Sequence, residues 1–269
     1  MLVVMAITWG LCISASSPPT VYGADVENQH HLVPAYFYPD WYNAGNKWYR
    51  MCNAMNTSVG KSVAIMNPAS GPGTKANADY TKVLAYCHAK KQKVIGYVDT
   101  GYGTVDLAAV IAAINKYYSF YPGIDGIFLD QMANDPAKAV VGSLNARTYY
   151  RSLYVHIKGR TAGTELVVGN PGAAAKTAWQ LAAPAVDVAV IFEGTAATYA
   201  AWNAPAWVST YRATRFSHLV YATTAASRQQ VCAASRARNG GYLYVTNDVL
   251  PNPWNTLPPY WSQEAPTCN

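Results

Sequence analysis

The sequence predicts a single α/β domain, a (β/α)8 barrel of the TIM type. Eight short apolar stretches alternate with segments of helical periodicity, and neighbouring parallel strands need such helical crossovers. From Leu32 onward the chain has 238 residues, 269 less 31, close to the roughly 250 typical of one barrel. The stretch 126–129 runs directly into Asp130, and active sites of such barrels lie at the C-terminal ends of the strands.

The expected strands are short, apolar and bounded by turn residues. They cover residues 32–38, 62–67, 93–99, 126–130, 165–170, 186–193, 216–222 and 242–246. Helices are expected through 48–55 and over about 79–91, 107–118 and 144–158. The third of these carries apolar residues three or four positions apart, and Asp106 is placed to cap its start. The Pro- and Trp-rich stretch 248–269 is expected to wrap the barrel as a tail.

The first residues have the features of an export signal. Residues 2–15 are apolar, but the run is short and interrupted for a membrane span. We expect residues 1–23 to be a signal peptide, 24–31 a short polar tail with solvated His30 and His31, and 32–269 the barrel with its tail. An uncleaved anchor is the alternative, because no Lys or Arg precedes the apolar run. The mature protein is expected to be secreted, extracellular or cell-wall associated, without stable membrane association.

Export places the cysteines in an oxidising compartment. Loss of Cys12 with the signal leaves four cysteines, which allow three disulfide connectivities. We expect Cys52 to pair with Cys87, joining the first two helices, and Cys232 with Cys268, tying the tail to the seventh helix. The chain has no CxxC motif, so zinc is not expected, nor is any other metal or cofactor.

Composition narrows the class of partner. The formal net charge is +6, but the 20 basic residues are scattered along the chain, whereas nucleic-acid binding requires a clustered basic face. The 21 Tyr and 8 Trp point to carbohydrate, because sugar rings stack on side chains with an apolar body and a polar tip. We expect a monomer whose partner is a polysaccharide substrate and not a nucleic acid.

The side chains at the C-terminal ends of the strands should converge on one mouth. They are mainly carboxylates, amides and tyrosines: Tyr38, Asp40, Asn67, Asp99, Asp130, Asn170, Glu193, Tyr221, Asn247 and Asp248. This set has no His, and the chain has no GxSxG, P-loop, GxGxxG or HExxH motif. Acid and base chemistry without His or metal leaves paired carboxylates, which is how glycoside hydrolases work.

Asp130 and Glu193 are the candidate catalytic pair. We expect Asp130 to be the nucleophile, because it ends the more rigid apolar strand, and Glu193 to be the general acid/base. Each could instead be structural, and Asp99 is the next carboxylate to consider. The candidate substrate-binding residues are Tyr38, Asn67, Asp99, Tyr102, Gln131, Asn170, Tyr221 and Asn247. Asn67 and Asn170 precede proline, which is also typical of turns.

Five sequence elements together resemble the spherulin-4 family, also called spherulation-specific family 4. They are Val-Pro-Ala-Tyr-Phe-Tyr-Pro at 33–39, Asn-Pro-Ala-Ser-Gly-Pro-Gly at 67–73, Gly-Tyr-Val-Asp-Thr-Gly-Tyr-Gly at 96–103, Gly-Ile-Phe-Leu-Asp at 126–130 and Gly-Asn-Pro-Gly at 169–172. The resemblance implies a (β/α)8 glycoside hydrolase acting on galactosaminogalactan, an α-1,4-linked polymer of galactose and N-acetylgalactosamine. It places the family's fourth-strand Asp on Asp130 and its sixth-strand Glu on Glu193.

One position departs from that family. Its members often have Asp-Glu after the fourth strand, whereas this chain has Asp130 followed by Gln131. Either Glu193 suffices as acid/base, or activity is weakened or altered. The expectation is an endo-acting, retaining glycosidase. The alternatives are a mechanism in which the substrate's N-acetyl oxygen attacks, a non-catalytic carbohydrate-binding barrel, and a spore- or wall-associated structural protein.

Overall fold

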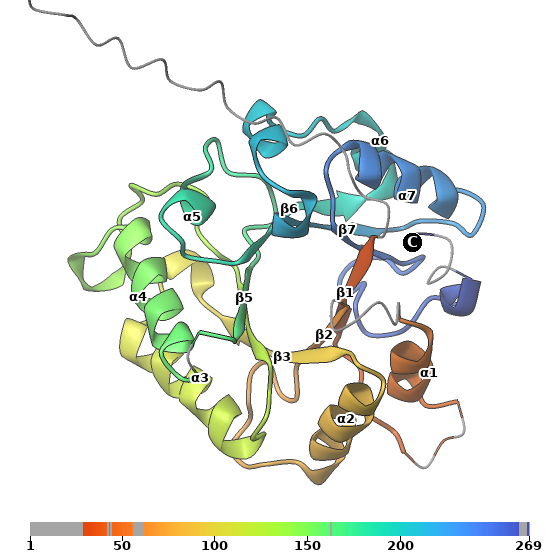
Figure 1. Ribbon diagram of the computed structural model, residues 1–269, viewed down its shortest axis with the longest axis horizontal. Helices are drawn as coiled ribbons and strands as arrows, with labels where there is room; N and C mark the ends of the chain where they lie inside the picture. The colour runs from red at the N-terminus through yellow and green to blue at the C-terminus, as the bar shows by residue number, and fades with distance from the viewer. Residues whose placement is uncertain are drawn as a thin grey trace, which may run out of the picture.

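The computed structural model describes residues 29–41, 43, 45–55, 62–161, 163–263 and 268. Its eight strands form a closed parallel barrel in sequence order (Figure 1). They are β1 His30–Ala35, β2 Val63–Met66, β3 Lys93–Asp99, β4 Gly126–Asp130, β5 Leu166–Gly169, β6 Val188–Thr195, β7 Phe216–Tyr221 and β8 Tyr242–Val245. Pairing of His30 with Tyr242 and of His31 with Leu243 closes the ring. The predicted fold class is confirmed.

The helices lie outside this ring, as Figure 1 shows. They are α1 Lys47–Ala54, α2 Ala78–Ala89, α3 Leu107–Phe120, α4 Ala146–Lys158, α5 Trp179–Ala182, α6 Ala196–Ala201 and α7 Arg228–Ala237. The predicted cap at Asp106 is present, because its carboxylate accepts the backbone N–H groups of Ala108 and Ala109. Such a cap satisfies donors that have no partner within the helix.

The strands are buried on both faces, which explains their nearly continuous apolar sequences. Gly126 allows β4 and β5 to lie very close together. Its φ is +156°, and a Cβ atom there would lie 1.9 Å from the carbonyl oxygen of Leu166. The close pairing sets β4 directly beside β5, so that Asp130 and the residue after β5, Asn170, become neighbours.

The start of the barrel differs from the expectation. β1 begins at His30, and both His30 and His31 are buried, so the prediction that they belong to a solvated tail is wrong. Burial lowers the pKa of His31 to about 3, and its neutral ring packs edge-on against Trp261 at 5.1 Å. A neutral imidazole can therefore occupy a core position that its polar sequence context did not suggest. The predicted signal peptide and residues 24–28 lie outside the described residues.

Both predicted disulfides are present. Cys52 and Cys87 join α1 to α2 with their Cα atoms 5.4 Å apart, and Cys232 joins α7 to Cys268 in the C-terminal segment at 5.1 Å. The described part of that segment also packs into the core through Trp254 and Trp261. Among the helices of the described residues, none is long and apolar enough to cross a membrane.

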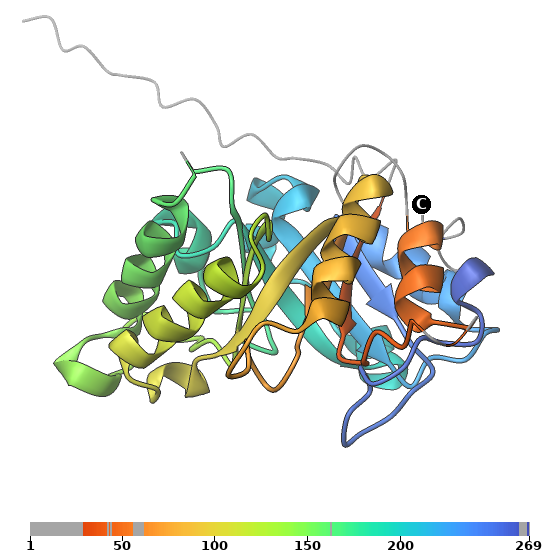
Figure 2. The ribbon, with the colours of Figure 1, turned by 90° about the horizontal axis from the view of Figure 1, so that it is seen from below.

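The loops that follow the strands gather at one end of the barrel. In the side view of Figure 2, the loop after β2 and the long loop after β8 extend from the same end. The C-terminal ends of β4, β5 and β6 open toward this end, because all eight strands are parallel. This is the end of the barrel where the sequence predicts the active site.

Candidate active site

Asp130 and Glu193 share a pocket of about 320 Å³ at the mouth of the barrel. Its lining consists of Tyr102, Asp130, Gln131, Asn170, Gly172, Glu193, Tyr221 and Leu250. The two carboxylates come from β4 and β6, with β5 between them. The volume falls within the range of small-ligand sites, roughly 300–1,000 Å³.

One amide nitrogen joins the two carboxylates. Nδ2 of Asn170 donates to Oδ1 of Asp130 at 2.8 Å and to Oε2 of Glu193 at 2.7 Å. These oxygens can therefore be no farther apart than 5.5 Å, the two distances added together. The Asn170 side chain is itself held, because its Oδ1 accepts the backbone N–H of Gly172 at 2.9 Å.

A β-bulge in β6 aims Glu193 at the pocket. In the register with β7, Val190 lies opposite Ser217, and Glu193 lies opposite Leu219, with an irregularity between Val190 and Phe192. Side chains alternate between the faces of a strand, so the extra residue puts Val190 and Glu193 on the same face although they are three positions apart. The backbone N–H of Glu193 also donates to the carbonyl of Gly172 at 3.2 Å, which ties β6 to the loop after β5.

The Asp130 carboxyl is buried but well supplied with hydrogen-bond donors. Burial raises its pKa above the ordinary aspartate value, and the nearby charge of Asp99 acts in the same direction. Hydrogen bonds from the Gln131 backbone, the Tyr97 hydroxyl and Asn170 counteract this increase. Three donors stabilise the ionised form, as a carboxylate nucleophile requires.

Glu193 also has a raised pKa, again mainly through burial, and the charge of Asp130 raises it further. Hydrogen bonds from Asn170 and from the indole of Trp254 lower it. Glu193 thus has two stabilising donors where Asp130 has three. A raised pKa favours the protonated form of the carboxyl group, which is the form that a general acid needs.

Three residues at or next to the rim of the pocket have a strained backbone. Tyr102, Gln131 and Ala222 have positive φ values of 55°, 48° and 52°, a conformation that costs a residue with a side chain about 1–2 kcal/mol. The carbonyl of Gln131 accepts the Tyr102 N–H at 2.6 Å and the Thr100 hydroxyl at 2.8 Å. These bonds hold the chain just beyond Asp130 in the strained conformation.

Four of the eight predicted substrate-binding residues line the pocket: Tyr102, Gln131, Asn170 and Tyr221. Asp99 lies next to it, opposite Asp130 in the sheet register, and its Oδ1 accepts the Gly101 N–H at 2.7 Å. Within the ranges that the structure describes, no three His, Cys, Asp or Glu side chains gather in a way that could hold a metal ion.

The other three predicted substrate-binding residues do not line this pocket. The Tyr38 hydroxyl donates to Asp79 at 2.6 Å, at the start of α2. The Asn67 side chain accepts the Gly71 N–H at 2.8 Å and closes the loop after β2. Asn247 is exposed, two residues beyond the end of β8.

The predicted site lacks several residues that lie near the carboxylates, among them Tyr97, Leu250 and Trp254. Tyr97 lies within β3, two residues before the strand end, and its hydroxyl bonds to Asp130. Leu250 and Trp254 lie in the segment after β8, where no periodic pattern places them. The one available signal was the Trp- and Pro-rich composition of that segment, which suggested that it packs on the barrel.

Comparisons with known proteins agree with this architecture. A sequence model of spherulation-specific family 4 matches residues 30–267. Spherulin-4 of Physarum polycephalum is 31% identical over 244 residues, which cover 87% of this chain and 68% of the relative. The crystal structure of Aspergillus clavatus Sph3 in complex with GalNAc superposes with a TM-score of 0.71 at 20% identity, covering 89% of this chain and 97% of the other. The chain therefore belongs to spherulation-specific family 4.

Proposed function

We propose that this protein is a secreted glycoside hydrolase that cuts galactosaminogalactan-like polysaccharide within the chain and with retention of configuration. The observation that carries the proposal is the carboxylate pair, in which the two oxygens bonded to the Asn170 amide nitrogen lie at most 5.5 Å apart. Retaining enzymes place their carboxyl groups about 5–5.5 Å apart, whereas inverting enzymes need about 6.5–9.5 Å to admit a water molecule. The fold's similarity to Sph3, which was crystallised in complex with GalNAc, supports the choice of an amino-sugar polymer.

In the proposed reaction, the Asp130 carboxylate attacks the anomeric carbon while Glu193 gives its proton to the glycosidic oxygen. The bond to the leaving sugar breaks, and a covalent glycosyl-Asp130 ester forms. The Glu193 carboxylate then takes a proton from water, and the resulting hydroxide attacks the same carbon and releases Asp130. The donor count supports these roles, because three hydrogen bonds favour the Asp130 anion and two favour the Glu193 anion.

The N-acetyl oxygen of the substrate is the alternative nucleophile, in which case Asp130 orients it. Trapping with a substrate analogue that slows the second step separates the two mechanisms. We expect mass spectrometry to find the sugar on the peptide that contains Asp130. A turnover-competent enzyme that never carries this label would favour attack by the substrate.

A non-catalytic carbohydrate-binding barrel is the second candidate function, because Gln131 lines the pocket at the position where the family often has an acid. Incubation with an α-1,4-linked galactose and N-acetylgalactosamine polymer separates the two functions. We expect new reducing ends and internal oligosaccharides from the wild-type chain. Retention on the polymer without release, together with activity gained by Gln131→Glu, would favour the binding function.

Two disulfides support export, since such bonds persist in oxidising compartments. Sequencing of the secreted protein should give an N-terminus near residue 24, and light scattering should give a monomer.

The net charge of +6 would repel a deacetylated, cationic galactosamine polymer. We therefore expect faster cleavage of acetylated regions, and faster cleavage of fully deacetylated polymer would contradict this preference.

A further inference from the structure

Aromatic side chains form a strip on the α1–α2 side of the barrel, outside the pocket. The strip consists of Tyr38, Trp41, Tyr49 and Tyr86. The rings of Tyr49 and Tyr86 are stacked, with centroids 4.8 Å apart and an interplanar angle of 28°, and Trp41 meets Tyr86 edge-on at 6.0 Å. Tyr38 and Tyr49 are 53% and 47% exposed, which is unusual for such large rings.

The end of the strip nearest the barrel is anchored on one residue of α2. The Tyr38 hydroxyl donates to the Asp79 carboxylate at 2.6 Å, and the Trp41 indole N–H donates to the Asp79 carbonyl at 3.0 Å. Both rings are thus fixed by their polar ends, and the Tyr38 side chain is exposed whereas that of Trp41 is half-buried. Aromatic rings held in this way bind with little loss of side-chain entropy.

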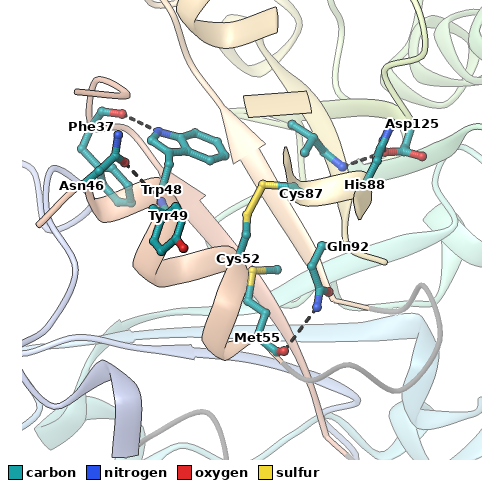
Figure 3. Close-up of a disulfide and its surroundings, with 11 residues drawn as sticks. Phe37, Asn46, Trp48, Tyr49, Cys52, Met55, Cys87, His88, Gln92 and Asp125 are labelled. Atoms are coloured by element: carbon teal, nitrogen blue, oxygen red, sulfur yellow. Dashed lines mark hydrogen bonds and ion pairs between the residues drawn. A yellow bond between two sulfur atoms is a disulfide. The ribbon is translucent and has the colours of Figure 1, made fainter. Parts of the chain in front are cut away.

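The other end of the strip lies next to the Cys52–Cys87 disulfide. Figure 3 shows Cys52 on α1 bonded to Cys87 on α2, with Tyr49 nearly one turn before Cys52. Tyr86 immediately precedes Cys87. The covalent link between the two helices therefore fixes the two rings that stack on each other.

The strip begins beside the candidate active site. Burial raises the pKa of Tyr36, and the charges of the nearby Asp130 and Glu193 raise it further. The Tyr36 backbone N–H donates to the carbonyl of Trp254, the residue whose indole bonds Glu193. Tyr38 follows two residues later, so their Cα atoms are at most about 7 Å apart. Tyr38 is thus the ring of the strip that lies nearest to Tyr36 along the chain.

The surrounding charges indicate an uncharged ligand. Lys90 caps the C-terminal end of α2, four residues after Tyr86, whereas the Lys82 ammonium is paired with the Asp79 carboxylate at 3.2 Å. The Lys90 ammonium lies 5.7 Å from the centre of the Tyr86 ring, and Arg50 is exposed next to Tyr49. A deacetylated amino sugar is cationic and would be repelled here, whereas galactose and N-acetylgalactosamine units are neutral.

We infer that the aromatic strip is a second binding site for neutral galactose- and N-acetylgalactosamine-containing polysaccharide, which holds the polymer beyond the units that enter the pocket. This inference names a further substrate-binding surface and rests on the proposed function. Sugar faces stack on Tyr49 and Trp41, and Tyr38 connects the strip with the pocket. The strip lets the enzyme hold a long polymer while short oligosaccharides depend on the pocket alone.

Binding is tested in a Glu193→Gln background, so that the polymer is not cut. We expect Tyr49→Ala to weaken retention on insoluble acetylated polymer by about two- to tenfold, and Tyr49→Phe to retain the parent affinity, because the ring is kept. Val155→Ala is the matched control, since Val155 is 54% exposed on α4, away from the strip. Parent-like retention by Tyr49→Ala, with its melting temperature unchanged, would overturn the inference.

Hydrolysis by the chain with Glu193 intact provides the second measurement. We expect Tyr49→Ala to raise KM for the polymer and to leave cleavage of short oligosaccharides unchanged. An equal loss on both substrates would overturn the inference, because Tyr49 would then act through the pocket. If the chain cuts neither substrate, the proposed hydrolase function fails, but the retention series still decides whether the strip binds polymer.

Discussion

Asp99 and Asp130 lie opposite each other in the register of β3 and β4, yet only Asp130 lines the pocket. The Asp99 carboxylate instead accepts the Gly101 N–H and closes the turn after β3. Its charge still reaches the site, where it raises the pKa of Asp130. Two aspartates at equivalent strand ends thus differ in environment, and we expect their substitution to reduce activity to different extents.

We expect Asp130→Asn and Glu193→Gln each to lower kcat/KM by about 100-fold or more, because covalent and acid–base steps lose their reacting groups. Asp99→Asn should cost far less, since that carboxylate serves a turn. Steady-state kinetics on the polymer, with melting temperatures as the folding control, check the comparison. Near-wild-type turnover by a folded Asp130 or Glu193 variant would make the assignment wrong.

Removal of the bridging amide should affect both carboxylates at once. Hydrogen bonds from Asn170 lower the pKa of Asp130 and of Glu193, so Asn170→Ala should move both limbs of the pH–rate profile to higher pH and reduce kcat. Asn67→Ala is a matched control, because Asn67 also closes an Asn-Pro turn through its side-chain oxygen, at a place outside the pocket. An identical pH profile for Asn170→Ala and wild type would exclude the bridging role.

The pH dependence of activity should be bell-shaped, with both limbs above ordinary carboxyl values. Activity needs Asp130 ionised and Glu193 protonated, and burial raises both pKa values. The acid limb should therefore lie above the unperturbed aspartate pKa of about 3.9. The two limbs belong to the coupled pair and not to either residue alone. Measurement of kcat/KM from acid to mildly alkaline pH tests this, and a profile flat through that range would contradict it.

The same raised pKa values predict a loss of stability as pH rises. The folded state binds these protons more tightly than the unfolded state does. The free energy of unfolding therefore decreases as the pH rises from the unfolded-state pKa values to the folded-state pKa values, and it is constant at higher pH. We expect the double variant Asp130→Asn/Glu193→Gln to melt at a higher temperature than wild type at pH 7. The difference should shrink below about pH 4. Thermal melts at both pH values provide the measurement. A double variant that melts at a lower temperature than wild type at pH 7 would contradict the prediction.

The two disulfides should contribute similarly to stability, because their cysteines are separated by 35 and 36 residues. We expect Cys52→Ser and Cys232→Ser each to lower the free energy of unfolding by roughly 2–4 kcal/mol, since each releases a loop of similar length in the unfolded state. Urea denaturation of the single variants measures both losses. Unchanged midpoints in both would show that neither bond stabilises the fold.

The strands were predictable because their signal is local. β3 and β4 end at Asp99 and Asp130, as the sequence indicates. An apolar run bounded by turn residues defines the ends of a buried strand to within a few residues. β1 begins two residues before the predicted start, because a polar His-His pair is typical of a solvent-exposed segment. The start of β1 can lie in the core because burial lowers the pKa of His31, which favours its neutral imidazole. That outcome depends on the packing around the ring and not on the local pattern.

The site was predictable only in part. A strand end places a residue at the mouth, but the direction of its side chain depends on where the strand stops. β1 stops at Ala35, so Tyr38 lies in a loop and turns to Asp79. β8 stops at Val245, so Asn247 is left in solvent. The bulge that orients Glu193 and the contact from Trp254 arise from tertiary packing, which no local pattern indicates.

The position of His30 determines how the protein can be tethered. Its backbone starts β1 at the end of the barrel opposite the pocket, where its N–H donates to the carbonyl of Gly241. A linker, affinity tag or solid support joined upstream of His30 therefore attaches on the face away from the mouth. Immobilisation through that end should leave the pocket directed outward, toward an insoluble polymer.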